Sequence, residues 1–351
     1  MKRRVFLTIL FCVLLAGMQF SPAQAAPPAK PVVLKAAMYL AASMPFSQAA
    51  IWLVQEVEKR SGGRLKVEYY WSGSLVPAKE TITGLQNGVA DLAFLVQSYE
   101  PGKLPLSNVT SLPAISEDWY TASMAFAELV KMPAIEAELA QYNIMYLSPL
   151  TNSSYQLWSK KLIRTVAELR GKKLLATGEH IVLVKALGAV PVSMVATESY
   201  SALEKGTLDG ALAPLSHSKG YKYDDVCKFY NPMPFGNKAF LVAMNRNSWK
   251  KIPPDLQKMF TDLREEACRR GHETYQIDGE KWIDKLVAEG KMKRTDPSAA
   301  DVELIRKKAK EEMWDKWVQK MKEKGLPGQE VLDRYVALLK KYDAQSPFKK
   351  K

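Results

Sequence analysis

The side chains that could carry out chemistry in this sequence are few, and their spacing argues against catalysis. The three histidines, His180, His217 and His272, have no metal-ligand spacing to one another or to a cysteine. No Gly-x-Ser-x-Gly nucleophile motif, Walker loop or dinucleotide fingerprint occurs. Glu80 and Asp91 resemble a pair of catalytic carboxylates, but Asp91 has a better structural explanation, given below. We therefore expect a protein without enzyme activity, metal ion or cofactor.

Aromatic and polar side chains are more informative, because several of them fall at expected strand ends or in the loops that follow. In α/β proteins the ligand cleft lies at such strand ends. An apolar cleft with a few hydrogen-bonding groups suits a small organic molecule. The candidate contacts of this kind are Tyr39, Trp71, Gln97, Tyr99, Tyr155 and Trp158.

A short motif that occurs twice indicates how these side chains are positioned. Both copies read Leu-x-x-Gly-x-x-Asp followed by small and apolar residues, with the glycines at Gly88 and Gly206 and the acids at Asp91 and Asp209. Each glycine falls where a helix ends on a left-handed residue, a conformation that glycine adopts without a Cβ clash. Each copy therefore predicts a helix that leads into a strand, and two copies predict two α/β domains of similar design.

Hydrophobic patterning places both copies within alternating strands and helices, which predicts mostly parallel sheets. After Pro253 and Pro254, apolar spacing favours a helix of about 35 residues that bridges both domains, although Gly271 and Gly279 weaken it. The fold class that the pattern predicts is α/β, with two domains and this long interdomain helix. The expected strands are 32–38, 65–70, 92–96, 143–147, 173–176, 190–195, a short one from residue 209, and 240–244.

The N-terminus indicates export. Three basic residues precede an apolar run over 5–20 that is too short for a membrane span, and an Ala-x-Ala site ends at Ala25. We expect a signal peptide cleaved after Ala25 and a periplasmic protein. Its removal lowers the formal net charge from +13 to +10. Without a nucleic-acid motif, we read this charge as a solvated surface and expect no nucleic-acid partner.

The two remaining cysteines, Cys227 and Cys268, could pair in an oxidising compartment or remain as two buried thiols. The expected division of the chain assigns each domain two segments. Residues 1–25 form the signal peptide, 26–150 with about 239–275 the first domain, 151–238 with about 276–345 the second domain, and 346–351 a basic tail.

Several motifs in the same order resemble the DctP-type solute-binding proteins of tripartite ATP-independent periplasmic (TRAP) transporters. The resemblance implies a clamp that closes on a small-molecule solute, a TRAP membrane permease as partner, and a monomer. The motifs are Arg60-Ser-Gly-Gly-Arg-Leu-Lys-Val67, both copies of the repeated motif, Lys185-Ala-Leu-Gly-Ala189, Met244-Asn245 with Trp249, and Ala309-Lys-Glu-Glu-Met-Trp-Asp-Lys-Trp317.

The chain departs from this family at four expected ligand contacts. Leu175 stands where a typical member has the arginine that pairs with a solute carboxylate, and Ser154 stands at the place of a second arginine. Ala213 replaces an asparagine, and Ala196 replaces a bulky aromatic residue. Thr177 and Asn237 complete the expected set of contacts.

These departures leave two interpretations of the solute open. The one we favour is a larger, more apolar or aromatic solute in a roomier pocket. The alternative is an ordinary organic acid held by a non-standard cation. The side chains that could replace the arginine are Lys172, Lys173, Lys238 and the hydroxyls of Ser154, Tyr155 and Thr177. A binding protein that feeds a sensor instead of a permease is a third possibility.

Overall fold

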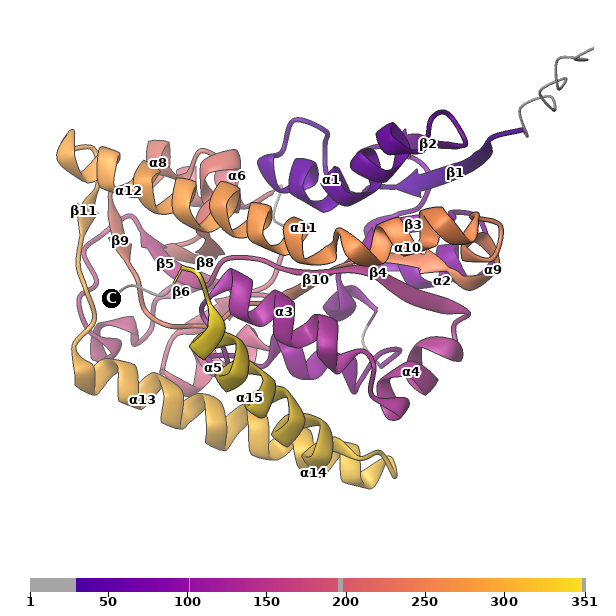
Figure 1. Ribbon diagram of the computed structural model, residues 1–351. Helices are drawn as coiled ribbons and strands as arrows, with labels where there is room; N and C mark the ends of the chain where they lie inside the picture. The colour runs from indigo at the N-terminus through magenta and orange to yellow at the C-terminus, as the bar shows by residue number, and fades with distance from the viewer. Residues whose placement is uncertain (1–29, 101, 195–197, 349–351) are drawn as a thin grey trace, which may run out of the picture.

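The computed structural model describes residues 30–100, 102–194 and 198–348 (Figure 1). The predicted signal peptide and its cleavage site at Ala25 lie outside these residues and stay predictions. Within the described ranges, no helix combines the length and the apolar character that crossing a membrane requires.

The first domain is built on a five-stranded sheet in the order β2-β1-β3-β10-β4. β1 pairs in parallel with β2 and β3, whereas β10 runs antiparallel to both of its neighbours. Side chains of β3 and β10 alternate between two buried clusters, one on each face of the sheet. The strands are β1 (Val32–Ala37), β2 (Leu65–Tyr70), β3 (Leu92–Leu95), β4 (Ile144–Thr151) and β10 (Ala239–Asn245).

Helices cover both faces of this sheet, as expected for strands that are apolar on both sides. One cluster buries α1, α10 and α11 against the sheet, and the other buries α2, α3 and α4. The helices are α1 (Pro45–Arg60), α2 (Thr81–Gln86), α3 (Trp119–Leu129), α4 (Pro133–Ala140), α9 (Arg246–Trp249), α10 (Pro254–Asp262) and α11 (Arg264–Gly271).

The second domain is built on a six-stranded sheet in the order β11-β9-β5-β8-β6-β7, in which β5 alone runs antiparallel to its neighbours. Both sheets are therefore mostly parallel, as predicted. The strands are β5 (Tyr155–Ser159), β6 (Lys173–Leu175), β7 (Val190–Val192), β8 (Gly210–Pro214), β9 (Phe229–Asn231) and β11 (Lys293–Arg294). The helices are α5 (His180–Ala186), α6 (Ser199–Glu204), α7 (Leu215–Gly220), α8 (Tyr223–Val226), α12 (Asp278–Ala288) and α13 (Ala299–Ala309).

The repeated motif has the same geometry in both domains. Gly88 and Gly206 have φ angles of 71° and 75°, the left-handed conformation predicted for both. Asp91 accepts a hydrogen bond from the backbone N–H of Lys35 at 2.8 Å, and Asp209 accepts one from Lys173 at the same distance. Each carboxylate therefore fixes the register of its strand against the neighbouring parallel strand, and this contact is the structural explanation of Asp91.

Two chain segments that cross between the domains are tied to each other. The segment 152–154 joins β4 to β5, and the segment before β10 returns to the first sheet. The backbone N–H of Lys238 donates to Oδ1 of Asn152 at 2.8 Å, and the backbone N–H of Asn152 donates to the carbonyl of Lys238 at 3.0 Å. These bonds give Lys238 a fixed backbone position at the boundary between the domains.

The expected long helix crosses from the first domain to the second (Figure 1). It consists of α11, the π-helical segment η6 (His272–Ile277) and α12, and Leu263 separates it from α10. A Cβ at Gly271 would lie 2.6 Å from Nε1 of Trp119 in the first domain. A Cβ at Gly279 would lie 2.8 Å from Cβ of Leu215 in the second. The two glycines that weakened the prediction therefore allow the helix to approach each domain closely.

A second helical path crosses back to the first domain. It runs from α13 through the π-helical segment η7 (Lys310–Trp314) into α14 (Asp315–Glu323), and α15 (Gly328–Gln345) follows. α15 packs beside α3 and contributes Tyr335 and Leu338 to the core of the first domain. Residues 276–345 were expected to lie together in the second domain, and the contacts of α15 place it instead against the first. An amphipathic pattern shows that a helix packs, but not on which domain.

Candidate functional site

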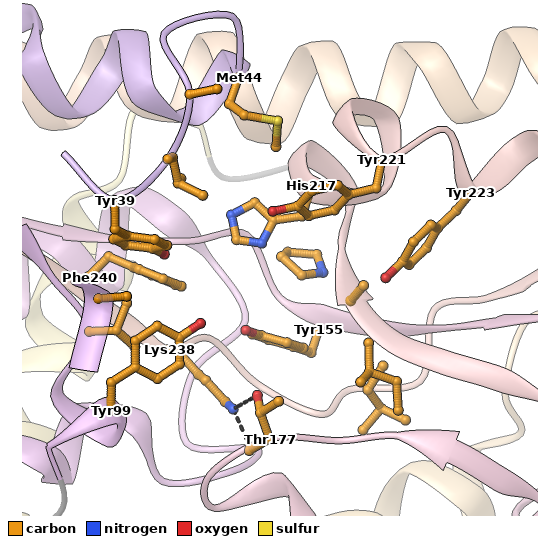
Figure 2. A pocket seen from close by; sticks show the side chains of 18 of the residues that line it. Tyr39, Met44, Tyr99, Tyr155, Thr177, His217, Tyr221, Tyr223, Lys238 and Phe240 are labelled. Atoms are coloured by element: carbon orange, nitrogen blue, oxygen red, sulfur yellow. Dashed lines mark hydrogen bonds between the residues drawn. The ribbon is translucent and has the colours of Figure 1, made fainter. Parts of the chain in front are cut away.

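A cavity of about 450 Å³ lies between the two domains, at one edge of each sheet (Figure 2). Tyr39, Val96 and Thr177 follow the carboxyl ends of β1, β3 and β6. Tyr155 begins β5, and Lys238 immediately precedes β10. β5 and β10 are the antiparallel strands, so their starts meet the ends of the parallel strands at the same edge. The topology thus gathers all five side chains around one space.

Lys238 supplies the positive charge of this cavity. The residue is only 2% exposed, and Nζ donates to the carbonyl oxygen and, at 3.1 Å, to Oγ1 of Thr177 (Figure 2). Nζ also lies 4.9 Å from the ring centre of Tyr155, a cation–π geometry. Burial lowers the pKa of Lys238 to about 8, and the nearby negative charge of Glu179 opposes this shift. The ammonium therefore remains mostly protonated at neutral pH.

His180 lies beneath Tyr155 and supports this wall. The two rings are 4.5 Å apart between centres, and Nε2 of His180 lies 2.8 Å from the carbonyl oxygen of Phe235. The carbonyl can only accept, so Nε2 carries the proton of that bond. Burial and the charge of Lys238 keep the pKa of His180 well below its usual value, so the ring is neutral. His180 thus orients Tyr155, and it is not among the residues that line the cavity.

Aromatic rings form most of the remaining wall. Tyr39 is stacked on Phe94 with 5.2 Å between ring centres and meets Tyr99 edge-on at 5.8 Å. The hydroxyls of Tyr39, Tyr99 and Tyr155 point into the cavity (Figure 2). Burial raises the pKa of all three phenols, so they are neutral hydrogen-bonding groups.

Ring side chains of the second domain form another wall of the cavity. His217 lies on α7, and its ring meets Phe240 edge-on with 5.7 Å between centres. Tyr221 ends α7 and lies 6.3 Å from His217 between ring centres. Tyr223 donates a hydrogen bond from its hydroxyl to Oγ of Ser199 at 2.5 Å. Burial lowers the pKa of His217 to about 4, so this imidazole is neutral as well.

The lining of the cavity is mostly apolar and aromatic, with a single strongly basic group. Among the described residues that line the cavity, Lys238 is the only side chain of lysine, arginine, aspartate or glutamate. The described part of the chain also holds no cluster of three or more histidine, cysteine or acidic side chains able to bind a metal ion.

The sequence model of the DctP family, described as bacterial extracellular solute-binding protein, family 7, matches residues 36–321. The chain belongs to this family. A solute-binding protein of Verminephrobacter eiseniae is 27% identical over 243 residues, which cover 67% of this chain and 71% of that protein. As a DctP-family member, the protein is a solute-binding component of TRAP transport, and the family is not a family of enzymes.

Solved structures of TRAP solute-binding proteins share the fold. A TRAP periplasmic solute-binding protein from Desulfovibrio salexigens, crystallised as an open complex, has a TM-score of 0.80 and 26% identity, and the match covers 90% of this chain and 98% of that one. A TRAP solute-binding protein from Rhodoferax ferrireducens, in complex with copurified benzoate, has a TM-score of 0.79 and 24% identity, with 90% and 99% of the two chains covered.

The structure brings half of the predicted ligand contacts to the cavity. Trp71 is stacked on Tyr69 instead, and Gln97 donates to the hydroxyl of Tyr146 at 3.1 Å; neither is among the lining residues. Ala196 lies outside the described residues. The predicted contacts that line the cavity are Tyr39, Tyr155, Leu175, Thr177 and Ala213.

Two other predicted contacts, Asn237 and Ser154, are not among the residues that line the cavity. Asn237 is buried and donates from Nδ2 to the carbonyl of Asn152 at 2.6 Å, which ties the two crossing segments together. Ser154 borders a separate, polar hollow beside the long helix. Asn237 therefore positions its neighbour Lys238 and is not among the residues that line the cavity.

The predicted set omits several lining residues. Tyr99 and Lys238 were named as possible contacts, whereas His217, Tyr221, Tyr223, Met44 and Phe240 were not. His217 lies in the first turn of α7, which follows β8 directly, so the rule that ligands meet strand ends could have found it; Tyr221 lies beyond the end of that helix. Of the three lysines considered as replacements for the arginine, Lys238 lines the cavity, while the side chain of Lys173 is exposed.

Proposed function

We propose that this DctP-family protein captures an apolar monocarboxylate, typically one with an aromatic ring, and that Lys238 pairs with its carboxylate. The two interpretations that the sequence left open then describe one solute. Because most of this solute is apolar, the protein lacks several polar contacts that typical family members have. Lys238 takes the place of the missing arginine.

The observation that carries this proposal is the isolation of a buried ammonium in an apolar cavity. Among the described residues, no carboxylate forms an ion pair with Lys238: both hydrogen bonds of Nζ go to Thr177, and Glu179 acts only as a more distant negative charge. A buried charge without a directly bonded counterion is costly. A solute carboxylate would supply the missing charge at the point where Nζ faces the cavity.

The same charge balance limits the number of carboxylates on the solute. With Lys238 as the single cation in the described lining, a second carboxylate would be buried without a partner. The rings of Tyr39, Tyr99 and Phe240 instead offer flat apolar surface to an aromatic or alicyclic group. Short dicarboxylates therefore match the cavity less well than a monocarboxylate with a ring.

Two solved structures of similar fold contain solutes of this class. The Rhodoferax ferrireducens protein holds copurified benzoate. A protein from Bordetella bronchiseptica, with a TM-score of 0.77 and 19% identity, holds (R)- and (S)-mandelate. These solutes belong to those proteins, and they show that the fold accommodates an aromatic acid.

A neutral apolar solute is the second candidate. Lys238 already donates to Thr177, so part of its hydrogen-bonding capacity is used within the protein. A thermal-shift panel separates the candidates, with benzoate and phenylacetate as monocarboxylates, succinate as a dicarboxylate and benzamide as a neutral analogue of benzoate. We expect the largest stabilisation from the aromatic monocarboxylates. Equal or larger shifts with benzamide or succinate would overturn the proposal.

We further propose that the mature protein begins after Ala25, acts as a monomer in the periplasm and delivers its solute to a TRAP permease. N-terminal sequencing and size-exclusion chromatography of protein secreted by its host test the first two points. Solute uptake by cells with and without the permease genes tests the third point. If the protein instead feeds a sensor, removal of the permease genes should leave solute uptake unchanged.

A further inference from the structure

A hydrogen bond between two side chains joins the domains beside the cavity. Nδ2 of Asn108 donates to Oε1 of Glu179 at 2.5 Å. Asn108 lies in the 3-10 helical segment η3 (Ser107–Ser111), in which Val109 belongs to the buried core of the first domain. Glu179 lies in the loop between β6 and α5 of the second domain. The bond therefore spans the boundary at which a two-domain clamp opens and closes.

This interdomain bond lies next to the solute cavity. In the second domain, Thr177 lines the cavity, and Glu179 lines a second hollow of about 290 Å³. In the first domain, Val96 lines the cavity, and Gln97 lines the second hollow together with Asn108. The two hollows therefore adjoin along the same two loops, one from each domain.

Backbone contacts hold Asn108 in place on the first domain. Glu138, a buried residue of α4, accepts hydrogen bonds from the backbone N–H groups of Leu106 and Ser107 at 2.6 and 2.9 Å. The N–H of Asn108 itself donates to the carbonyl of Leu104 at 3.2 Å. The side chain of Asn108 therefore moves together with the core of the first domain.

The loop that carries Glu179 also positions the proposed partner of the carboxylate. Thr177, two residues earlier, accepts both hydrogen bonds of Nζ of Lys238 (Figure 2). His180, the next residue, lies against the ring of Tyr155 with 4.5 Å between ring centres. A bond that holds this loop to the first domain therefore also holds the groups that direct the ammonium.

The charge of Glu179 has an effect of its own on this ammonium. Burial lowers the pKa of Lys238 to about 8, and the negative charge of Glu179 opposes this shift. The other ionisable groups around the ammonium are neutral, namely Tyr39, Tyr99, Tyr155 and His180. On the side of the second hollow, Lys320 and Lys324 of α14 face Glu179. Glu179 is thus the group that favours the protonated lysine.

We infer that the bond between Asn108 and Glu179 forms when the domains close on a solute, and that both are positioning residues of the carboxylate site. The bond stabilises the closed form, so a solute that contacts both domains binds more tightly. The charge of Glu179 keeps Lys238 protonated. This inference rests on the proposed function and adds to it two residues that are not among those lining the cavity.

Removal of the interdomain bond should reduce affinity and not stability. In calorimetry at pH 6.5, Asn108→Ala should weaken benzoate binding by roughly tenfold, the size of one hydrogen bond to a charged group. The free energy of unfolding of the solute-free protein should hardly change, since both groups meet water in the open form. A permanent structural contact predicts the opposite pattern, with lower stability and unchanged affinity, and that result would overturn the inference.

An exchange of the two chemical groups gives a test that does not depend on a loss of function. Asn108→Asp places two carboxylates against each other and should weaken benzoate binding more than Asn108→Ala does. The addition of Glu179→Gln restores an amide–carboxylate pair with the roles reversed. The double variant should bind benzoate more tightly than Asn108→Asp and than Asn108→Ala. A double variant that binds no better than Asn108→Asp alone would overturn the inference.

The charge of Glu179 is tested separately by pH. Glu179→Gln keeps an oxygen that accepts from Asn108 but removes the negative charge, so the pKa of Lys238 should fall further below its usual value. Benzoate affinity should then begin to decrease at a pH lower by about 0.5 to 1 unit than in the unmodified protein. Glu204→Gln removes the same charge from an exposed side chain of α6 and should leave the profile unchanged. Equal profiles in all three proteins would show that the charge of Glu179 has no such role.

The outcomes separate this inference from the proposal on which it rests. If Lys238→Met abolishes benzoate binding but Asn108→Ala leaves affinity unchanged, the inference is wrong and the carboxylate site stands. If Lys238→Met leaves benzoate binding unchanged but the exchange at Asn108 and Glu179 restores affinity, the carboxylate site is wrong and the interdomain bond stands. If benzoate and the other compounds of the panel do not bind, both ideas fail.

Discussion

Nζ of Lys238 donates to the carbonyl oxygen and to Oγ1 of Thr177, the latter at 3.1 Å, so a residue at the crossing between the domains is anchored to a loop of the second domain. An ammonium group has three N–H donors. Two are directed to Thr177, and this orients the remaining donor. In the proposed site, the cation is thus already held in place before a solute arrives.

Replacing Lys238 should weaken solute binding strongly but change the stability of the solute-free protein little. We expect Lys238→Met to weaken binding of an aromatic monocarboxylate by roughly 100-fold, since removing one partner of a buried ion pair costs about 3 kcal/mol or more. The solute-free protein should lose no more than about 1 kcal/mol and can gain stability, because an unpaired buried charge is removed. Calorimetry and urea denaturation measure the two effects.

Lys173→Met is the matched control, because Lys173 has an exposed side chain on β6, the strand that leads to Thr177. It should change neither quantity. Equal losses of affinity in both variants would show that general surface charge attracts the solute, and the role of Lys238 would then be wrong.

Solute affinity should depend on pH above neutrality. In the solute-free protein the pKa of Lys238 is about 8 because of burial, and a carboxylate bound beside it would raise that pKa. Binding therefore takes up a proton at pH values above 8. Affinity should be level between about pH 6 and 7.5 and then fall by up to tenfold per pH unit above pH 8. Lys238→Met should abolish this fall, and an equally steep fall in that variant would contradict the assignment.

The glycines of the long helix should resist replacement by alanine. Alanine normally stabilises a helix interior by about 1 kcal/mol relative to glycine. At Gly271 and Gly279, however, a Cβ would lie 2.6 Å and 2.8 Å from Trp119 and Leu215. We expect Gly271→Ala and Gly279→Ala to destabilise the protein by about 1–3 kcal/mol in urea denaturation. Thr274→Ala, an exposed change in the same helix, should alter stability by less than about 0.5 kcal/mol.

The two aspartates of the repeated motif should behave alike. Each accepts a backbone hydrogen bond that holds two parallel strands in register, and Asp91 also accepts one from Oγ of Ser248 at 2.5 Å. Asp91→Ala and Asp209→Ala should each reduce the free energy of unfolding by about 1–3 kcal/mol, with the larger loss at Asp91. The exposed change Glu303→Ala should cost little. Neutral effects at both aspartates would contradict their structural role.

The scaffold could be predicted from sequence because its signals are local. Gly88 and Gly206 mark helix ends by their need for a left-handed backbone, and Asp91 and Asp209 follow at a fixed spacing. The interdomain helix is also a local, periodic signal, although its start at Arg264, after a break that separates it from α10, was not predicted. What periodicity does not encode is the partner of an amphipathic face, and α15 therefore packs on the first domain against expectation.

The site was only partly predictable, for a topological reason. The rule that ligands meet the carboxyl ends of parallel strands finds Tyr39 and Thr177. Lys238 precedes an antiparallel strand, so its place at the same edge follows only from the strand order, which the sequence does not reveal. Trp71 and Gln97 lie near strand ends but pack on Tyr69 and Tyr146 instead, and the direction of a side chain just beyond a strand depends on such contacts.

A crystal structure of the protein with bound benzoate tests the central claim most directly. The account predicts a carboxylate oxygen within hydrogen-bonding distance of Nζ of Lys238, with the ring between Tyr39, Tyr99 and Phe240. A carboxylate that points away from Lys238, or that is held by another cation, would contradict it.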